Sequence, residues 1–96
     1  MKFTRAGIPT SLRFAFQEYG LDELDLAEHA FTVIERTLAY GNRAEVGWLF
    51  ARYGSQRLVE WLQQGGWRTL PKRRLKLWAT YFDLPPFPER RGIWPH

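Results

Sequence analysis

Three short turn signals divide the middle of this chain, and they limit it to short structural elements. They are Gly41-Asn42, Gly54-Ser55 and Gly65-Gly66, and each combines residues that favour turns and helix ends. Between them, apolar side chains recur at the i, i+3, i+4 and i+7 spacing of one face of an α-helix. The pattern predicts an all-α protein.

The apolar periodicity also predicts how many helices form and where they lie. We expect a compact four-helix bundle with helices at about residues 26–40, 42–54, 56–64 and 71–84. Asp25 is the expected N-cap of the first helix, and Asn42 that of the second. In the fourth helix, Leu77 and Tyr81 add a second apolar face, so this helix should lie centrally in the core.

The two ends of the chain lack helical periodicity. Residues 12–19 indicate an extended N-terminal segment, packed on the helices by Phe14 and Phe16, with a short helix as the open alternative. Residues 85–96 contain four prolines, which predict an extended C-terminal arm. We therefore expect one helical domain over residues 1–84 and a Pro-rich arm over residues 85–96.

Length and composition exclude several classes of protein. A chain of 96 residues suffices for one small core, and the absence of cysteine excludes a thiol nucleophile and a Cys-ligated metal. No apolar stretch is long enough for a signal peptide or a membrane span. We expect a cytoplasmic protein that does not contact membranes.

The side chains that enzymes need are nearly missing from the sequence. Only two histidines occur, and Ser11 and Ser55 resemble helix caps rather than nucleophiles. Asp25 and His29 are spaced i, i+4 and could both bind a metal ion, but two ligands make a weak site. The simpler interpretation is an aspartate and a histidine one turn apart on the surface. We expect no catalytic residue, no metal and no cofactor.

Charge is distributed unevenly and points to an anionic partner. Residues 1–60 carry net −1 and residues 61–96 carry net +5. Basic residues at the start of the fourth helix face the positive end of the helix dipole, which is unfavourable unless an anion binds there. Trp94 is the expected apolar anchor of the arm. The predicted partner-binding residues are Trp48, Arg68, Lys72, Arg73, Arg74, Lys76, Arg90, Arg91 and Trp94.

The second and third expected helices also have the length and the turn glycine of a helix-turn-helix. Phe50 is large for the close helix contact of such motifs, and Glu60 would repel phosphates. Nucleic-acid binding is therefore the alternative. The residues expected to serve it are Gln56, Arg57, Lys72, Arg73 and Arg74.

Parts of residues 20–85 resemble a family of small bacterial helical proteins of unknown function. The most specific elements are Ile34-Glu-Arg, Leu38 with Tyr40-Gly41, Trp48-Leu49 and Arg52-Tyr53-Gly54. Such proteins are often encoded beside nucleotidyltransferase-type toxins of the AbiEii class. The resemblance implies an antitoxin or accessory protein that binds and neutralises a partner toxin, and it transfers no functional residues. Residues 63–69 depart from the pattern.

Overall fold

The computed structural model describes residues 2–18, 20–85 and 87. The α-helices in this part of the chain are α1 (Ala30–Tyr40), α2 (Arg43–Tyr53), α3 (Ser55–Gln63) and α4 (Lys72–Tyr81). Short 3-10 helices are η1 (Thr10–Phe16), η2 (Leu21–Glu23) and η3 (Gly66–Arg68). The described residues contain no β-strand, so the predicted all-α class is confirmed. None of their helices is long and apolar enough to cross a membrane.

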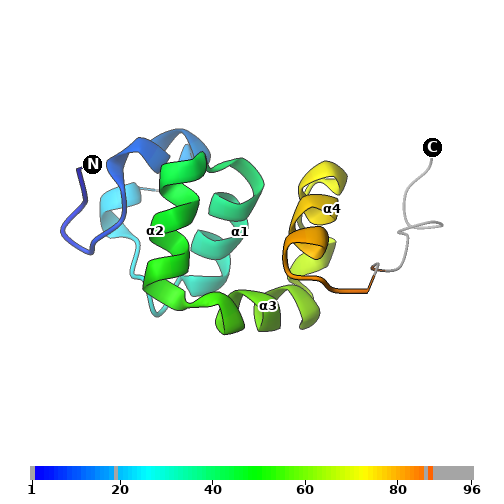
Figure 1. Cartoon of the computed structure of the whole chain (residues 1–96). Helices are drawn as coiled ribbons and strands as arrows, with labels where there is room; N and C mark the ends of the chain where they lie inside the picture. The colour runs from blue at the N-terminus through cyan, green and yellow to red at the C-terminus, as the bar shows by residue number, and fades with distance from the viewer. Residues whose placement is uncertain (1, 19, 86, 88–96) are drawn as a thin grey trace.

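Helices α1 and α2 form a tight hairpin and lie side by side (Figure 1). Gly41 ends α1 with extended backbone, and a Cβ atom there would lie 2.6 Å from the Thr37 carbonyl oxygen. Asn42 caps α2 as predicted, because its side chain accepts a hydrogen bond from the Glu45 N–H. The two-residue link therefore depends on the small size of glycine and on the asparagine cap.

The buried Glu45 carboxylate connects this hairpin to the N-terminal segment. Its Oε1 accepts a hydrogen bond from the Asn42 backbone N–H at 2.8 Å, which completes a capping box. Its Oε2 accepts one from the Ser11 hydroxyl at 2.5 Å, and the Glu45 residue is only 1% exposed. The sequence suggested that Ser11 is a helix cap. In the structure, its hydroxyl instead donates a hydrogen bond to the buried Glu45 carboxylate.

The prediction of an extended N-terminal segment over residues 12–19 is wrong for the part that forms η1. There the alternative prediction, a short helix, is correct. Leu12, Ala15 and Phe16 are buried together, because a spacing of three and four residues places them on one face of a helical turn. Phe14 lies on the opposite face and is 52% exposed, so it does not pack this segment as expected.

Asp25 caps a turn that precedes α1. Its Oδ1 accepts hydrogen bonds from the backbone N–H groups of Ala27 and Glu28, both at 2.8 Å. The Nδ1 atom of His29 accepts one from the Asp25 N–H at 2.9 Å. The Asp25 and His29 side chains thus bind backbone groups, and α1 begins at Ala30, four residues later than predicted.

Helix α3 leads from the base of the α1–α2 hairpin to α4, which lies at the far side of α1 (Figure 1). The expectation that α4 is central in the core is wrong. Trp78 is buried, but Leu77 is 50% exposed and Tyr81 is 64% exposed. With α4 at one edge of the molecule, one side of the helix is covered by α1 and α2, and the second apolar face is left in solvent.

Candidate functional site

The covered side of α4 binds the end of α1 through two side chains. The indole Nε1 of Trp78 donates to the Leu38 carbonyl oxygen at 3.0 Å. The Arg74 guanidinium donates to the same oxygen at 3.3 Å and to the Gly41 carbonyl oxygen at 3.2 Å. These carbonyl groups lie at the negative end of the α1 dipole, where a cation is favourable. Arg74, one of the predicted partner-binding residues, thus has a structural role in holding α4 on α1.

Exposed basic and apolar residues lie along α4 beside this covered side. Arg73, Leu77 and Tyr81 follow each other at intervals of four, so they form one stripe along the helix. Lys72 and Lys76 flank this stripe and are also exposed. We call this surface the α4 face and define it by Lys72, Arg73, Lys76, Leu77 and Tyr81.

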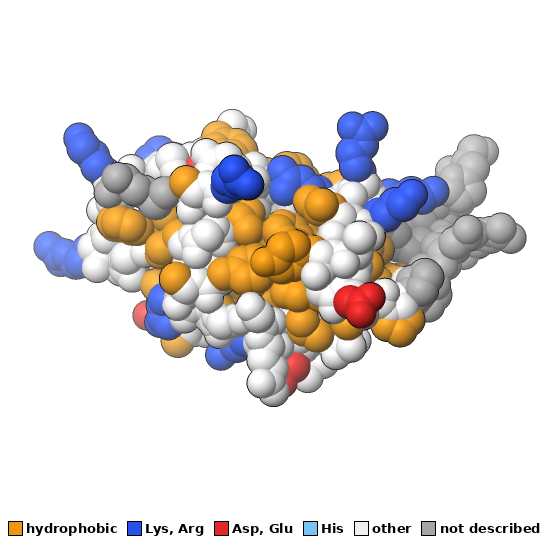
Figure 2. All heavy atoms as spheres, viewed as in Figure 1, with side chains coloured by type: hydrophobic (Ala, Val, Ile, Leu, Met, Phe, Trp, Pro, Cys, Tyr) orange, Lys and Arg blue, Asp and Glu red, His pale blue; other side chains and the backbone are white. Residues whose placement is uncertain are grey.

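The three cations of the α4 face have no ion-pair partner among the described carboxylates. Two of them, Lys72 and Arg73, lie in the first turn of α4, which contains no acidic residue and has no side-chain cap. Figure 2 shows hydrophobic side chains gathered where α2 and α4 meet, with Lys and Arg side chains on the rim beside α4. The face combines apolar area with unpaired positive charge.

A cluster of aromatic rings supports the exposed ring of Tyr81. The Tyr81 ring contacts the Phe50 ring edge-on, with 5.6 Å between the centroids, and the Trp78 ring in the same way at 5.7 Å. Phe82 lies 5.2 Å away in the same T-shaped arrangement. The Tyr81 ring is therefore held in place by its neighbours while most of its surface stays open to solvent.

The other predicted partner-binding residues are dispersed. Trp48 is half-buried and packs against the core, and Arg68 is exposed with its guanidinium 5.3 Å from the Trp67 ring centre. The ring of Phe87, at the start of the arm, stacks on Trp67 at 5.6 Å. Arg90, Arg91 and Trp94 lie outside the described residues, as does most of the predicted arm.

The residues considered for reading nucleic acid lie at the start of α3. Gln56 and Arg57 are exposed, and the Arg57 guanidinium lies 5.5 Å from the ring centre of Tyr53. The Tyr53 hydroxyl donates to the Leu26 carbonyl oxygen at 2.6 Å, and burial raises the pKa of this phenol. Phe50, which the sequence suggested would keep α2 and α3 apart, packs against Trp78 and Phe82 of the α4 segment.

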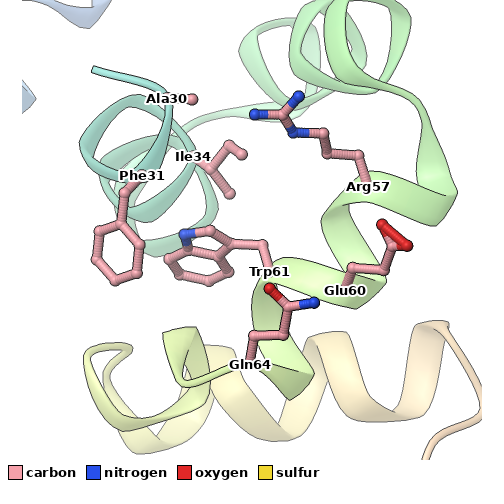
Figure 3. A pocket seen from close by; sticks show the side chains of 7 residues that line it. All are labelled: Ala30, Phe31, Ile34, Arg57, Glu60, Trp61 and Gln64. Carbon is pink, nitrogen blue, oxygen red and sulfur yellow. The ribbon is translucent and has the colours of Figure 1, made fainter. Parts of the chain in front are cut away.

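A groove between α1 and α3 was not predicted (Figure 3). It has a volume of about 390 Å³, and its lining includes Phe31 on α1 and Arg57, Trp61 and Gln64 at the other side. Helical spacing from the buried Ala30 and Ile34 predicts that Phe31 is buried as well, yet this residue is 49% exposed. The i, i+4, i+7 spacing of Arg57, Trp61 and Gln64 is the pattern that could have indicated a shared face.

The described residues contain no group of three or more acidic or histidine side chains that could hold a metal ion. No curated protein and no solved structure matches the chain significantly. The model of one protein family, described as a family of unknown function (DUF6922), matches residues 12–62. This region runs from within η1 to the last turn of α3, includes most of the groove lining, and ends before α4. Because the match covers more than half of the 96 residues, the chain belongs to this family of unknown function.

Proposed function

We propose that this chain is a non-catalytic binding protein whose α4 face docks on an acidic surface of a partner protein. The observation that supports the proposal is the exposed stripe of Arg73, Leu77 and Tyr81, beside two further cations that have no ion-pair partner among the described residues. Arginine and aromatic side chains are the residue types that most often dominate the binding energy of protein interfaces.

The position of the cations favours an anionic partner. In the first turn of a helix each exposed cation costs roughly 0.3–1 kcal/mol, because it faces the positive end of the helix dipole. Arg74 is compensated by the carbonyl groups at the end of α1, whereas Lys72 and Arg73 have no such contact among the described residues. Carboxylates of a docked protein would supply the missing compensation and would speed the encounter.

A toxin is the partner that we propose. The chain resembles helical proteins often encoded beside nucleotidyltransferase-type toxins of the AbiEii class, and an antitoxin can act by covering the active site of its toxin. In this proposal the α4 face meets the acidic surface of the toxin, Arg90 and Arg91 extend the charge, and Trp94 is a second apolar anchor. The chain itself supplies no catalytic group and works in the cytoplasm.

Binding of duplex nucleic acid by α3 has less support. Glu60 would repel phosphates, and the Arg57 guanidinium lies over the Tyr53 ring and lines the groove that faces α1. In contrast to the stripe on α4, α3 presents no exposed aromatic side chain beside its cation. The capture experiment below distinguishes nucleic-acid binding from protein binding.

The proposal is tested by affinity capture from the native host with three tagged baits: wild type, Tyr81→Ser and Phe14→Ser. Phe14 and Tyr81 are both more than half exposed aromatic residues, but only Tyr81 belongs to the α4 face. Each capture is run with and without nuclease. We expect a protein in stoichiometric amount with wild type and with Phe14→Ser, and its loss with Tyr81→Ser, unaffected by nuclease.

Two results would overturn the proposal. One is the capture of the same protein by all three baits, because the α4 face would then not be the contact. The other is the recovery of nucleic acid with every co-purifying protein released by nuclease. In that case Arg57, Lys72 and Arg73 become the first residues to replace.

A further inference from the structure

The indole N–H of Trp61 is a buried donor without a partner. Trp61 is 8% exposed, and its Nε1 atom has no hydrogen-bond acceptor among the described residues. Buried tryptophan nitrogens usually find an acceptor, and leaving such a group unpaired costs about 1–3 kcal/mol. Figure 3 shows this nitrogen turned toward α1, on the side of Phe31 and Ile34. Among the described residues, this donor of the groove lining thus has no acceptor.

A second donor faces the same space. The Arg57 guanidinium reaches across the groove toward α1, whereas the Glu60 carboxylate on the same helix points away from α1 (Figure 3). No ion pair within 4.0 Å joins Arg57 to a described carboxylate. The inner part of the groove therefore combines positive charge with an unpaired N–H.

The rest of the lining toward α1 is apolar. Ala30 and Ile34 form its wall, and the half-exposed ring of Phe31 lies 5.2 Å from the Trp61 ring, between centroids. The volume of about 390 Å³ falls at the lower end of the range for small-molecule sites, roughly 300–1,000 Å³. A fitting ligand is small, with one anionic end and one apolar end.

We propose that this groove binds a carboxylate attached to an aromatic or aliphatic group. One carboxylate oxygen accepts from the Arg57 guanidinium and the other from the Trp61 indole N–H, and the apolar part packs against Phe31. A single carboxylate matches one cation and one neutral donor in charge and in number of acceptor oxygens.

The Phe31 ring acts as a movable cover in this proposal. The Trp61 nitrogen is shielded from solvent and the half-exposed Phe31 ring lies against the Trp61 ring, so in this proposal Phe31 changes rotamer to admit the ligand. Rotamer changes of exposed side chains take picoseconds to nanoseconds, which makes this step fast. The site is separate from the α4 face, and the proposal stands independently of the toxin partner.

The carboxylate can come from a free organic acid or from the C-terminus of a peptide. The test is a titration of ¹⁵N-labelled full-length chain, followed by the indole N–H signals in ¹H–¹⁵N spectra. The Trp61 signal is assigned from its absence in Trp61→Phe, or from its Overhauser contacts to the Phe31 ring. The probe is 3-phenylpropionate, and its uncharged amide, 3-phenylpropanamide, is the control ligand.

We expect a saturable downfield shift of the Trp61 indole proton with the acid, at an affinity on the order of millimolar, as for ligands of this size. Arg57→Gln should weaken binding about tenfold or more, which corresponds to ~1.4 kcal/mol. Arg52→Gln is the matched control and should bind normally. The guanidinium carbons of Arg52 and Arg57 both lie 5.5 Å from the Tyr53 ring centre, but only Arg57 lines the groove.

Three results would each overturn the proposal. They are a Trp61 signal that stays unchanged during the titration, equal binding of the acid and the amide, and an equal weakening of binding by Arg57→Gln and Arg52→Gln. A second titration distinguishes the sources of the carboxylate. It uses a short N-acetylated peptide ending in phenylalanine, as its free acid and as its C-terminal amide. Tighter binding of the peptide acid than of 3-phenylpropionate assigns the site to peptide ends, and weaker binding assigns it to free acids.

Discussion

The indole nitrogen of Trp78 donates a hydrogen bond to the carbonyl oxygen of Leu38, 40 residues earlier in the chain, at 3.0 Å. This contact joins α4 to the C-terminal end of α1, and Arg74 strengthens it by binding the same oxygen. Neighbouring residues of α4 therefore differ in role. Arg74 and Trp78 hold the helix on the fold, whereas Arg73 and most of the Tyr81 ring stay in solvent.

Replacing the two neighbouring arginines of α4 should separate stability from binding. Arg74→Gln removes the donors to the Leu38 and Gly41 carbonyl oxygens and should lower the free energy of unfolding by about 1 kcal/mol. Arg73→Gln removes an exposed cation without a described partner and should change stability by less than about 0.5 kcal/mol. Urea unfolding of both variants measures the difference, and equal losses would contradict this division.

The buried Glu45 carboxylate should be essential for the connection between η1 and α2. Glu45→Ala removes the acceptor for both Ser11 and Asn42, and we expect a loss of about 2–4 kcal/mol in the free energy of unfolding. Ser11→Ala removes only one of these hydrogen bonds and should cost about 1–2 kcal/mol. Thermal unfolding of the single variants and the double variant tests this coupling, and strict additivity of the two losses would argue against it.

The turn before α1 should weaken in acid. Hydrogen bonds from the backbone N–H groups of Glu28 and Ala27 lower the pKa of the Asp25 carboxyl below its usual value. A lowered pKa in the folded state means that the charged form stabilises the fold above the unfolded pKa of about 3.9, and that this contribution is lost as the pH falls through the folded value.

The comparison that isolates this charge is wild type against Asp25→Asn, because asparagine can still cap the turn. We expect a stability difference in favour of wild type that is constant above about pH 5 and shrinks steadily toward pH 2. Chemical unfolding at each pH gives the difference. A difference that stays level or widens in acid would show that the Asp25 charge does not stabilise the fold.

Two glycines of the α1–α2 hairpin should respond in opposite ways to alanine. Gly41→Ala places a Cβ atom 2.6 Å from the Thr37 carbonyl oxygen, so the hairpin must shift and lose roughly 1–3 kcal/mol. Gly47 lies inside α2 with open space around its Cβ position, and Gly47→Ala should stabilise by about 0.5–1 kcal/mol. Melting temperatures of the two variants check both signs.

Local sequence rules predicted the elements that depend on neighbouring residues. Asn42 caps α2, Gly54 ends it, and α3 lies within one residue of its expected bounds at either end. These features arise within a few residues, through capping hydrogen bonds and through backbone freedom such as the positive φ of Gly54. Cap residues, turn glycines and apolar periodicity were together sufficient for them.

The features that the sequence missed depend on contacts between distant segments. Nothing near Glu45 in the chain indicates that its carboxylate is buried against Ser11, 34 residues away. The direction of Arg74 depends on the end of α1, and the exposure of Tyr81 depends on where α3 carries α4. The basic cluster was found from composition, but its division into a structural Arg74 and an exposed Arg73 required the fold.

The affinity of the captured partner for purified variants tests the central claim most directly. Isothermal titration calorimetry compares wild type, the double variant L77S/Y81S and the control F14S against the same partner protein. If the α4 face is the contact, L77S/Y81S binds at least about tenfold more weakly while F14S binds as wild type does. An unchanged affinity of L77S/Y81S would contradict the account.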